Sequence, residues 1–362
     1  MSQLIKKIAS GEKTKQDLTA DEARWLWERA LRGELLDVQL GALLAAWRLK
    51  GETAAELEGC LRATAASLRR VPGPLPPGLV LTCGATSGKG HHFLAAPAAL
   101  CVAAAAGLPV ACVGLGGDQV RFPLTEVDVF RRLGVAVDLA PADVSRVLRQ
   151  AGLVVWRQVH AAPALARLSA LRVPLGMRTV AQAVEKFVDP LGAGAMVAGA
   201  FHLNYLERLA HVLARLAGQE GWAPAFLLLQ ERDGGVDVAP LHPVVGFRVR
   251  PGAVEPLRVP VEELGLRRVL SAEVPPLGLP ETAALTEELL AGGGPEPLRS
   301  MVALSAGLLL FAGGKEERLA RCVERAAAVL ASGAGLRTLA ALRQAAPAGG
   351  SGQGPDAAAA GG

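Results

Sequence analysis

The stretch from Leu79 to Gly107 constrains the fold of this chain more than any other. It begins with a short apolar run at 79–82, which is typical of a buried strand. It ends with an alanine-rich run at 93–106, which predicts a helix closed by Gly107. Between them lies a loop that contains glycines, residues 83–90. A strand, a glycine loop and a helix in this order allow backbone N–H groups to hold a phosphate, so the loop is a candidate anion site.

The loop matches neither of the two common phosphate-binding motifs. A P-loop has four residues between its glycines and then Gly-Lys-Ser/Thr, whereas three residues separate Gly84 from Gly88, and Gly90 stands where the hydroxyl should be. A G-x-G-x-x-G pattern is also missing. We therefore expect a degenerate phosphate loop with Gly84, Ser87, Gly88 and Gly90 as its key positions and Lys89 beside them. A flexible strand-to-helix turn is the alternative.

The chain before this loop predicts a small helical domain over residues 1–70. Thr19 and Glu22 have the spacing of a capping box, and apolar residues then recur at helical spacing. Prolines mark a rigid link at 71–78. An α/β domain is expected over 79–345, and the Ala- and Gly-rich residues 346–362 predict a disordered tail.

The α/β domain is indicated by strands that alternate with helices, with short connections between them. We expect a central, mostly parallel sheet flanked by helices. The expected strands are 79–83, 109–114, 135–139, 153–156, 195–200 and 225–230, and the stretch 236–261 is β-like. The expected helices are 93–106, 125–133, 142–151, 163–172, 179–187, 203–217, 281–291, 297–311 and 315–332.

The cysteines, histidines and apolar stretches indicate the cellular compartment of the protein and the kinds of site it can contain. Five cysteines are dispersed among the 362 residues without a C-x-x-C pair, which favours reduced thiols in the cytoplasm. The most apolar stretch, 95–116, is interrupted by Pro97, Gly107 and Pro109, so we expect no membrane span. His91 and His92 are adjacent and would diverge on a helix, and no acidic residue sits beside them, so they do not predict a metal site.

One basic stretch is free of acidic residues. Between positions 144 and 184 the chain has six arginines and no Asp or Glu. Arginines without neighbouring counter-charges favour a phosphate-binding groove, and a solvated basic surface is the alternative. The formal net charge of +4 permits a polyanionic partner without requiring one.

The order of these parts resembles the anthranilate phosphoribosyltransferase family, within the nucleoside-phosphorylase-like glycosyltransferases. The resemblance covers about residues 3–345 and is carried by the N-terminal helices and by segments such as 172–179 and 189–193. It implies a helical domain followed by an α/β domain. It also implies that Arg172 matches the arginine that contacts the anthranilate carboxylate in active members.

The resemblance is weakest at the catalytic positions. Active members carry Gly-Thr-Gly-Gly-Asp-Gly for the pyrophosphate of phosphoribosyl pyrophosphate (PRPP), and the match starting at Gly84 lacks two of the glycines and the acid. The family's Asn-Ile-Ser-Thr is Leu-Ala-Ala-Pro at 94–97, and its His-Gly-Asn-Arg segment loses the Asn and Arg at 113–117. Of the acidic pair that holds Mg²⁺, only Asp237 remains. The chain looks most like a non-tryptophan branch that is described as binding nucleic acid.

These observations lead to two hypotheses. The first is a non-catalytic protein that binds single-stranded DNA or RNA, or another polyanion, without a cofactor, through a cleft formed by Lys89, Arg167, Arg172, Arg178 and Lys186. The alternative is a transferase that moves a pentosyl group from PRPP to an unidentified acceptor. In this hypothesis Lys89 replaces metal charge at the pyrophosphate, Arg172 orients an acidic acceptor, and Asp237 is the residue that would hold Mg²⁺. A scaffold in which neither site works is a third possibility. Trp25, Trp27 and Trp47, together with the resemblance, predict a homodimer through the N-terminal helices.

Overall fold

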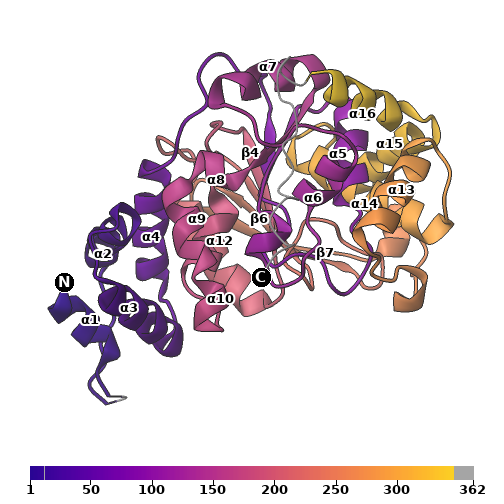
Figure 1. The fold of residues 1–362 in the computed structure, drawn as a ribbon. Coiled ribbons are helices and arrows are strands. Elements are labelled where there is room, and N and C mark those ends of the chain that lie inside the picture. The colour runs from indigo at the N-terminus through magenta and orange to yellow at the C-terminus, as the bar shows by residue number, and fades with distance from the viewer. Residues whose placement is uncertain (12, 346–362) are drawn as a thin grey trace, which may run out of the picture.

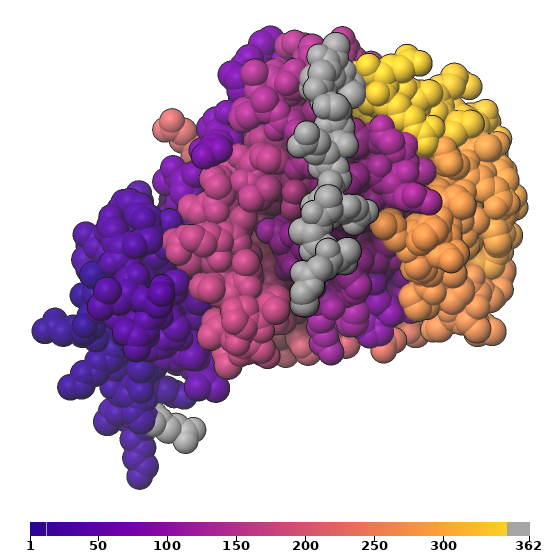
Figure 2. All heavy atoms as spheres, viewed as in Figure 1, coloured from indigo at the N-terminus to yellow at the C-terminus, as the bar shows by residue number. Residues whose placement is uncertain are grey.

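A computed structural model describes residues 1–11 and 13–345 of the chain (Figure 1). The N-terminal helices form a lobe that is set off from the larger α/β domain. Figure 2 shows this lobe as the indigo part of the surface. The predicted disordered tail, 346–362, lies outside the described residues.

The N-terminal lobe contains four helices. They are α1 (Ser2–Ala9), α2 (Ala20–Arg32), α3 (Asp37–Lys50) and α4 (Ala54–Ala66). The predicted capping box starts α2, since the Thr19 hydroxyl accepts from the Glu22 N–H and the Glu22 carboxylate accepts from the Thr19 N–H. Thr53 and Glu56 start α4 in the same way. Trp27 and Trp47 are buried and pack edge to face with ring centroids 6.3 Å apart.

The larger domain is built on a seven-stranded sheet with the order β3-β2-β1-β4-β5-β6-β7. Strands β1 to β5 are parallel, and β6 and β7 extend the sheet as an antiparallel edge. The strands are β1 (Val80–Thr82), β2 (Val110–Gly114), β3 (Leu153–Arg157), β4 (Ala195–Ala200), β5 (Phe226–Gln230), β6 (Val244–Arg250) and β7 (Ala253–Val259). This confirms the predicted fold class.

Helices cover both faces of the sheet (Figure 1). The alanine-rich α5 packs against α14 and α16, while α12 packs against β5, β6 and the N-terminal α4. The α-helices of this domain are α5 (Ala96–Ala105), α6 (Glu126–Arg132), α7 (Pro141–Ala151), α8 (Gln158–Ala161), α9 (Pro163–Ala170), α10 (Arg172–Leu175), α11 (Ala181–Val184), α12 (Leu203–Leu216), α13 (Leu279–Leu290), α14 (Glu296–Ala312), α15 (Leu319–Ala331) and α16 (Ala334–Gln344). Short 3₁₀ turns lie at η1 (Gly117–Gln119), η2 (Glu185–Phe187), η3 (Val261–Leu264) and η4 (Ser271–Glu273).

One predicted strand is wrong. Residues 135–139 alternate apolar and other side chains, and Val135, Val137 and Leu139 are buried, but the segment is not a strand. It lies beside β3, where the Arg157 N–H donates to the Val137 carbonyl at 3.0 Å and the Trp156 indole donates to the Leu139 carbonyl. Burial of alternate residues explains the pattern without a ladder of backbone hydrogen bonds.

The described residues include no helix that is both long enough and apolar enough to cross a membrane. All five cysteines are buried and free. The cytoplasmic location stays a prediction.

Candidate active site

The site lies where two loops meet at the carboxyl ends of parallel strands. The glycine loop follows β1, residues 231–237 follow β5, and β4 lies between these two strands in the sheet. Loops at the carboxyl ends of neighbouring parallel strands converge, and this is where open α/β sheets bind their ligands.

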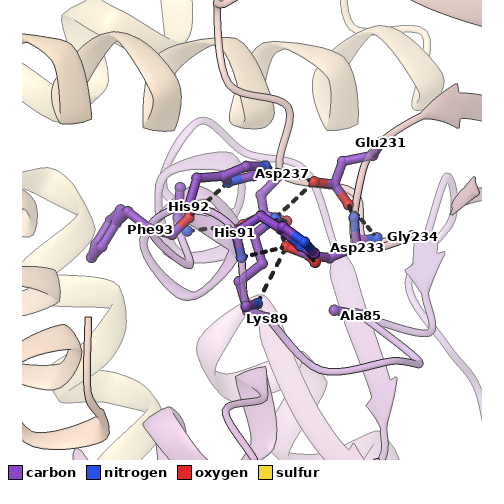
Figure 3. Close-up of polar contacts among 12 residues, drawn as sticks. Ala85, Lys89, His91, His92, Phe93, Glu231, Asp233, Gly234 and Asp237 are labelled. Atoms are coloured by element: carbon purple, nitrogen blue, oxygen red, sulfur yellow. Dashed lines mark hydrogen bonds and ion pairs between the residues drawn. The ribbon is translucent and has the colours of Figure 1, made fainter. Parts of the chain in front are cut away.

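Lys89 joins the two loops (Figure 3). Its ammonium nitrogen lies 3.0 Å from Glu231 Oε1, 2.9 Å from Asp237 Oδ1 and 3.9 Å from Asp233 Oδ2. The side chain is fully buried. Burial alone would lower the pKa of Lys89, but the negative charges of Asp237 and Glu231 outweigh it and raise that pKa above its ordinary value. Lys89 is therefore a permanent cation inside the protein.

The same carboxylates accept hydrogen bonds from the backbone. Asp233 Oδ2 accepts from the N–H groups of Gly90 and His91, both at 3.3 Å. Asp237 Oδ2 accepts from the Ala95 N–H at 3.0 Å, at the start of α5. The helix N-terminus that could hold a phosphate thus holds a side chain of the protein itself.

The glycines of the loop accommodate another part of the chain. A Cβ atom on Gly88 would lie 1.7 Å from the Phe122 carbonyl oxygen, and one on Gly90 would meet the Phe122 ring at 2.6 Å. The Phe122 N–H donates to the Ser87 carbonyl at 3.0 Å, and the Lys89 N–H donates to the Leu124 carbonyl at 2.8 Å. These contacts explain the glycines by close packing of the backbone on residues 120–124.

The adjacent histidines face acidic partners. His91 and His92 lie in a loop and not on a helix; His91 Nδ1 contacts Asp233 Oδ1, and His92 Nε2 lies 2.7 Å from Glu231 Oε1. Ligand atoms of His92, Glu231 and Asp233 all lie within 4.8 Å of one another. The expectation that the histidines have no acidic neighbours is wrong, because the acids come from a loop about 140 residues away in the sequence.

Glu126 is a second buried acid at the loop. Both of its carboxylate oxygens accept from the Ala85 N–H, at 3.0 and 3.2 Å, and a Cβ on Gly84 would lie 2.7 Å from Glu126 Oε2. Burial and the nearby charge of Asp237 raise the pKa of Glu126 from 4.5 to about 7.

The Glu126→Gln variant is expected to flatten the dependence of stability on pH. Between pH 4.5 and about 7 the folded protein keeps the Glu126 proton, which the unfolded chain has lost, so stability falls as the pH rises through this window. The loss reaches up to about 3 kcal/mol, and the glutamine removes it while its oxygen still accepts from Ala85. Urea unfolding at pH 5 and pH 8 measures the change. If the free energy of unfolding changes equally between pH 5 and pH 8 in Glu126→Gln and in the wild type, this prediction is wrong. The control is Glu324→Gln, at an exposed position.

Lys186 lies on the other side of the glycine loop. Its ammonium donates to Thr86 Oγ1 at 2.7 Å and to the Gly234 carbonyl at 3.2 Å. It is buried and forms no ion pair with any carboxylate in the described part of the chain. Burial, and then the positive charge of Arg178, lower the pKa of Lys186 to about 8. Arg178 also lacks a hydrogen bond or ion pair among residues 1–11 and 13–345.

The remaining predicted binding residues are engaged within the protein. Arg172 donates to Glu185 Oε2 at 2.6 Å, to the Thr86 carbonyl at 2.9 Å and to the Ser169 carbonyl at 2.9 Å. Arg167 donates to the Ala30 carbonyl at 2.7 Å, at the end of α2, and so ties α9 to the N-terminal lobe. The structure brings Lys89, Arg172 and Lys186 to the loop, with Arg178 close to Lys186, and places Arg167 at the domain contact.

The basic stretch is not free of counter-charges in space. Arg146 pairs with Asp143 at 3.0 Å, and Arg157 lies 3.2 Å from Asp138. Both acids lie outside positions 144–184. Three of the six arginines in this run, Arg146, Arg157 and Arg172, are therefore paired with acids that lie outside it.

A resident Mg²⁺ does not fit at Asp237. Lys89 takes one carboxylate oxygen of Asp237 and the Ala95 N–H takes the other, as described above. The following residue, Val238, offers no ligand atom. Mg²⁺ needs near-octahedral oxygen ligands at about 2.0–2.1 Å, and the Lys89 ammonium already lies among these oxygens.

Two family models match nearly the whole chain. The helical bundle domain of a glycosyl transferase family matches residues 2–68, and the a/b domain of the same family matches residues 78–336. The chain belongs to this glycosyl transferase family. The branch within the family stays a prediction.

Relatives within this family match almost the full length of the chain. Anthranilate phosphoribosyltransferase of Symbiobacterium thermophilum is 30% identical over 345 residues, covering 95% of this chain and 97% of that protein. The enzyme of Desulforudis audaxviator is 34% identical over 343 residues, covering 93% and 94%. The crystal structure of the Thermus thermophilus enzyme matches with a TM-score of 0.81 at 28% identity, covering 95% of this chain and 99% of that one. The Saccharomyces cerevisiae enzyme, solved with PRPP and Mg, shares the fold with a TM-score of 0.79.

These comparisons correct the first functional hypothesis. The prediction of a non-catalytic protein that binds nucleic acid is wrong, because full-length relatives at about 30% identity are transferases. In the structure, two of the five predicted groove residues, Lys89 and Arg172, are paired with carboxylates, and Arg167 donates to a backbone carbonyl of the N-terminal lobe. The alternative hypothesis is supported better.

Several site residues were missed in the sequence. Glu126, Glu231, Asp233 and the two histidines carry most of the polar contacts of the site. The acids among these residues could have been found in the sequence, because positions 231, 233 and 237 closely follow the predicted strand 225–230. Acids at the carboxyl end of a parallel strand are expected near the ligand site of such a sheet.

Proposed function

We propose that this protein transfers a pentosyl group from PRPP to a nucleophilic acceptor. The observation that carries the proposal is Lys186, a buried ammonium at the glycine loop without a carboxylate partner in the described chain, with the unpaired Arg178 near it. A buried ammonium is costly unless an anion neutralises it, and a phosphate group of the donor would do so. Arg178, which is exposed, would add a second positive charge for that phosphate. The relatives named above act as phosphoribosyltransferases, which supports this reaction class.

In the proposed reaction the acceptor nitrogen forms a bond to the anomeric carbon of the pentose while the bond from that carbon to pyrophosphate breaks. The acceptor nitrogen loses its proton to solvent, and pyrophosphate leaves with the bonding electrons. Fixed positive charge near the leaving group lowers the barrier because negative charge develops there. Anthranilate is the first acceptor to test, since the relatives are named for it.

The Lys186→Met variant is expected to bind PRPP about 10- to 100-fold more weakly than the wild type, because a charge-assisted hydrogen bond contributes about 1.5–3 kcal/mol. Wild-type affinity should also fall above pH 8, where Lys186 loses its proton, and the affinity of the variant should not follow that change. Calorimetry with PRPP at pH 7 and pH 9 measures both effects. Lys315→Met is the matched control, since Lys315 forms no ion pair in the described chain. Release of pyrophosphate from PRPP in the presence of anthranilate tests the transfer itself. If PRPP gives no calorimetric binding signal with the wild-type protein, the proposal is overturned.

We also propose that the protein forms a homodimer through the N-terminal helices. Of the three predicted tryptophans, Trp27 and Trp47 are buried in the lobe and only Trp25 is exposed. Support comes from Val38 and Leu49 on α3, which are 75% and 81% exposed. They are about three helical turns apart and therefore share a face. The Val38→Lys/Leu49→Lys variant is expected to convert a dimer to a monomer in size-exclusion chromatography with light scattering, and a wild-type monomer would contradict the proposal.

A further inference from the structure

Several backbone donors of the glycine loop and of the start of α5 are already occupied by carboxylates of the protein. Four backbone N–H groups, at Ala85, Gly90, His91 and Ala95, donate to acidic side chains. These N–H groups belong to the loop and to the start of α5, which are the places where this architecture could hold an anion. The protein thus supplies its own anions at these positions, and each anion needs a cation.

The cation is Lys89. Its ammonium lies within 3.0 Å of oxygens from both Glu231 and Asp237, and within 3.9 Å of Asp233 (Figure 3). Its backbone is held by the bond from the Lys89 N–H to the Leu124 carbonyl. Glu231 is fixed as well, because its second oxygen accepts from the Asp233 and Gly235 N–H groups, both at 2.8 Å.

We propose that the Lys89 ammonium takes the place of a divalent metal ion at this site, so that the carboxylates of Glu231, Asp233 and Asp237 do not bind Mg²⁺ or Mn²⁺. The inference rests on the proposed transfer from PRPP, because that reaction makes the charge next to the pyrophosphate important. A metal ion would have to displace a buried ammonium that two carboxylates hold directly. Displacement would leave that ammonium buried without a partner, which costs several kcal/mol.

The arrangement explains two features of the sequence together. The loop has a lysine at position 89, and the carboxylate that the family uses beside Asp237 is a valine, Val238. The Lys89 ammonium supplies a fixed positive charge among the carboxylates that remain, and Val238 adds no further ligand for a metal ion. His92 Nε2 lies 2.7 Å from the same Glu231 oxygen that Lys89 contacts, so this oxygen already has two partners within the protein.

The first test is a titration of the wild-type protein with Mn²⁺, with free Mn²⁺ measured by electron paramagnetic resonance. We expect no stoichiometric binding below about 1 mM, whereas one ion per chain bound at about 0.1 mM or tighter would overturn the inference. The Lys89→Met variant should bind Mn²⁺ at least about tenfold more tightly, because its carboxylates lose their cation. Lys7→Met is the control, since Lys7 pairs with Glu22 on the surface.

Two further measurements complete the test: the folding of Lys89→Met with and without Mn²⁺, and the binding of PRPP in EDTA. If Lys89→Met does not fold in metal-free buffer, Mn²⁺ should promote its folding, and the wild-type titration decides the matter in any case. Calorimetry of PRPP binding to the wild type in EDTA separates the two proposals. Binding retained within about threefold supports both, and binding that requires Mg²⁺ overturns the inference alone. If PRPP binds under neither condition, the proposed function fails while the Mn²⁺ titration still tests the role of Lys89.

Discussion

The Lys89→Met variant is expected to lose about 3–5 kcal/mol of its free energy of unfolding at pH 8, because it leaves buried carboxylates without their cation. Glu231 and Asp237 are both buried and both lie within 3.0 Å of the Lys89 nitrogen. Methionine has nearly the shape of the lysine stem, so the change removes the charge with little loss of packing. Urea unfolding followed by circular dichroism measures the difference.

Two comparisons identify the cause of this loss. Lys7→Met removes a partly exposed pair with Glu22 and is expected to cost less than about 1 kcal/mol. Adding Asp237→Asn to Lys89→Met removes one unpaired charge and should restore part of the lost stability. A Lys89→Met protein that loses no more than Lys7→Met would show that the carboxylates are hydrated or protonated in the folded protein.

The Gly88→Ala variant is expected to lose about 2–5 kcal/mol of its free energy of unfolding. Part of the loss is conformational, since Gly88 has a φ of +70°, where a residue with a Cβ costs about 1–2 kcal/mol. The rest is steric, because the Cβ would lie 1.7 Å from the Phe122 carbonyl oxygen and the backbone must move. Thermal unfolding and binding of PRPP should both be affected, since the loop has to shift.

Gly192→Ala separates the two causes. Gly192 has a φ of +66°, and a Cβ there would meet nothing within 4 Å. This variant should therefore show only the conformational loss of about 1–2 kcal/mol. Equal losses for the two variants would contradict the close packing of the glycine loop on Phe122.

The helices could largely be predicted from the sequence because their ends are local. The capping boxes at Thr19 and Thr53 use residues three positions apart, and Gly33 and Gly51 follow α2 and α3. The same holds for the buried strands, whose continuous apolar runs mark a parallel sheet. The segment 135–139 shows the limit, since alternating burial alone does not reveal whether a neighbouring strand is available for pairing.

The candidate site could be predicted only in part. The glycine loop and Lys89 were found because they follow a strand and precede a helix, which is a local pattern. Glu231 was missed and Asp237 was named only as a possible Mg²⁺ ligand, since both lie more than 140 residues from Lys89 in the sequence. The same distance explains the histidines, whose acidic neighbours come from the loop after β5.

The sequence by itself determined the family, the two-domain order and the parallel α/β sheet, because caps, periodicity and motif spacing are short-range properties of the chain. Only the tertiary structure decided which charges remain unpaired. Arg172 is neutralised by Glu185 and Arg157 by Asp138, whereas Lys186 has no carboxylate partner in the described chain. Electrostatic interactions depend on distance in space and on burial, and neither quantity can be read from positions along the chain.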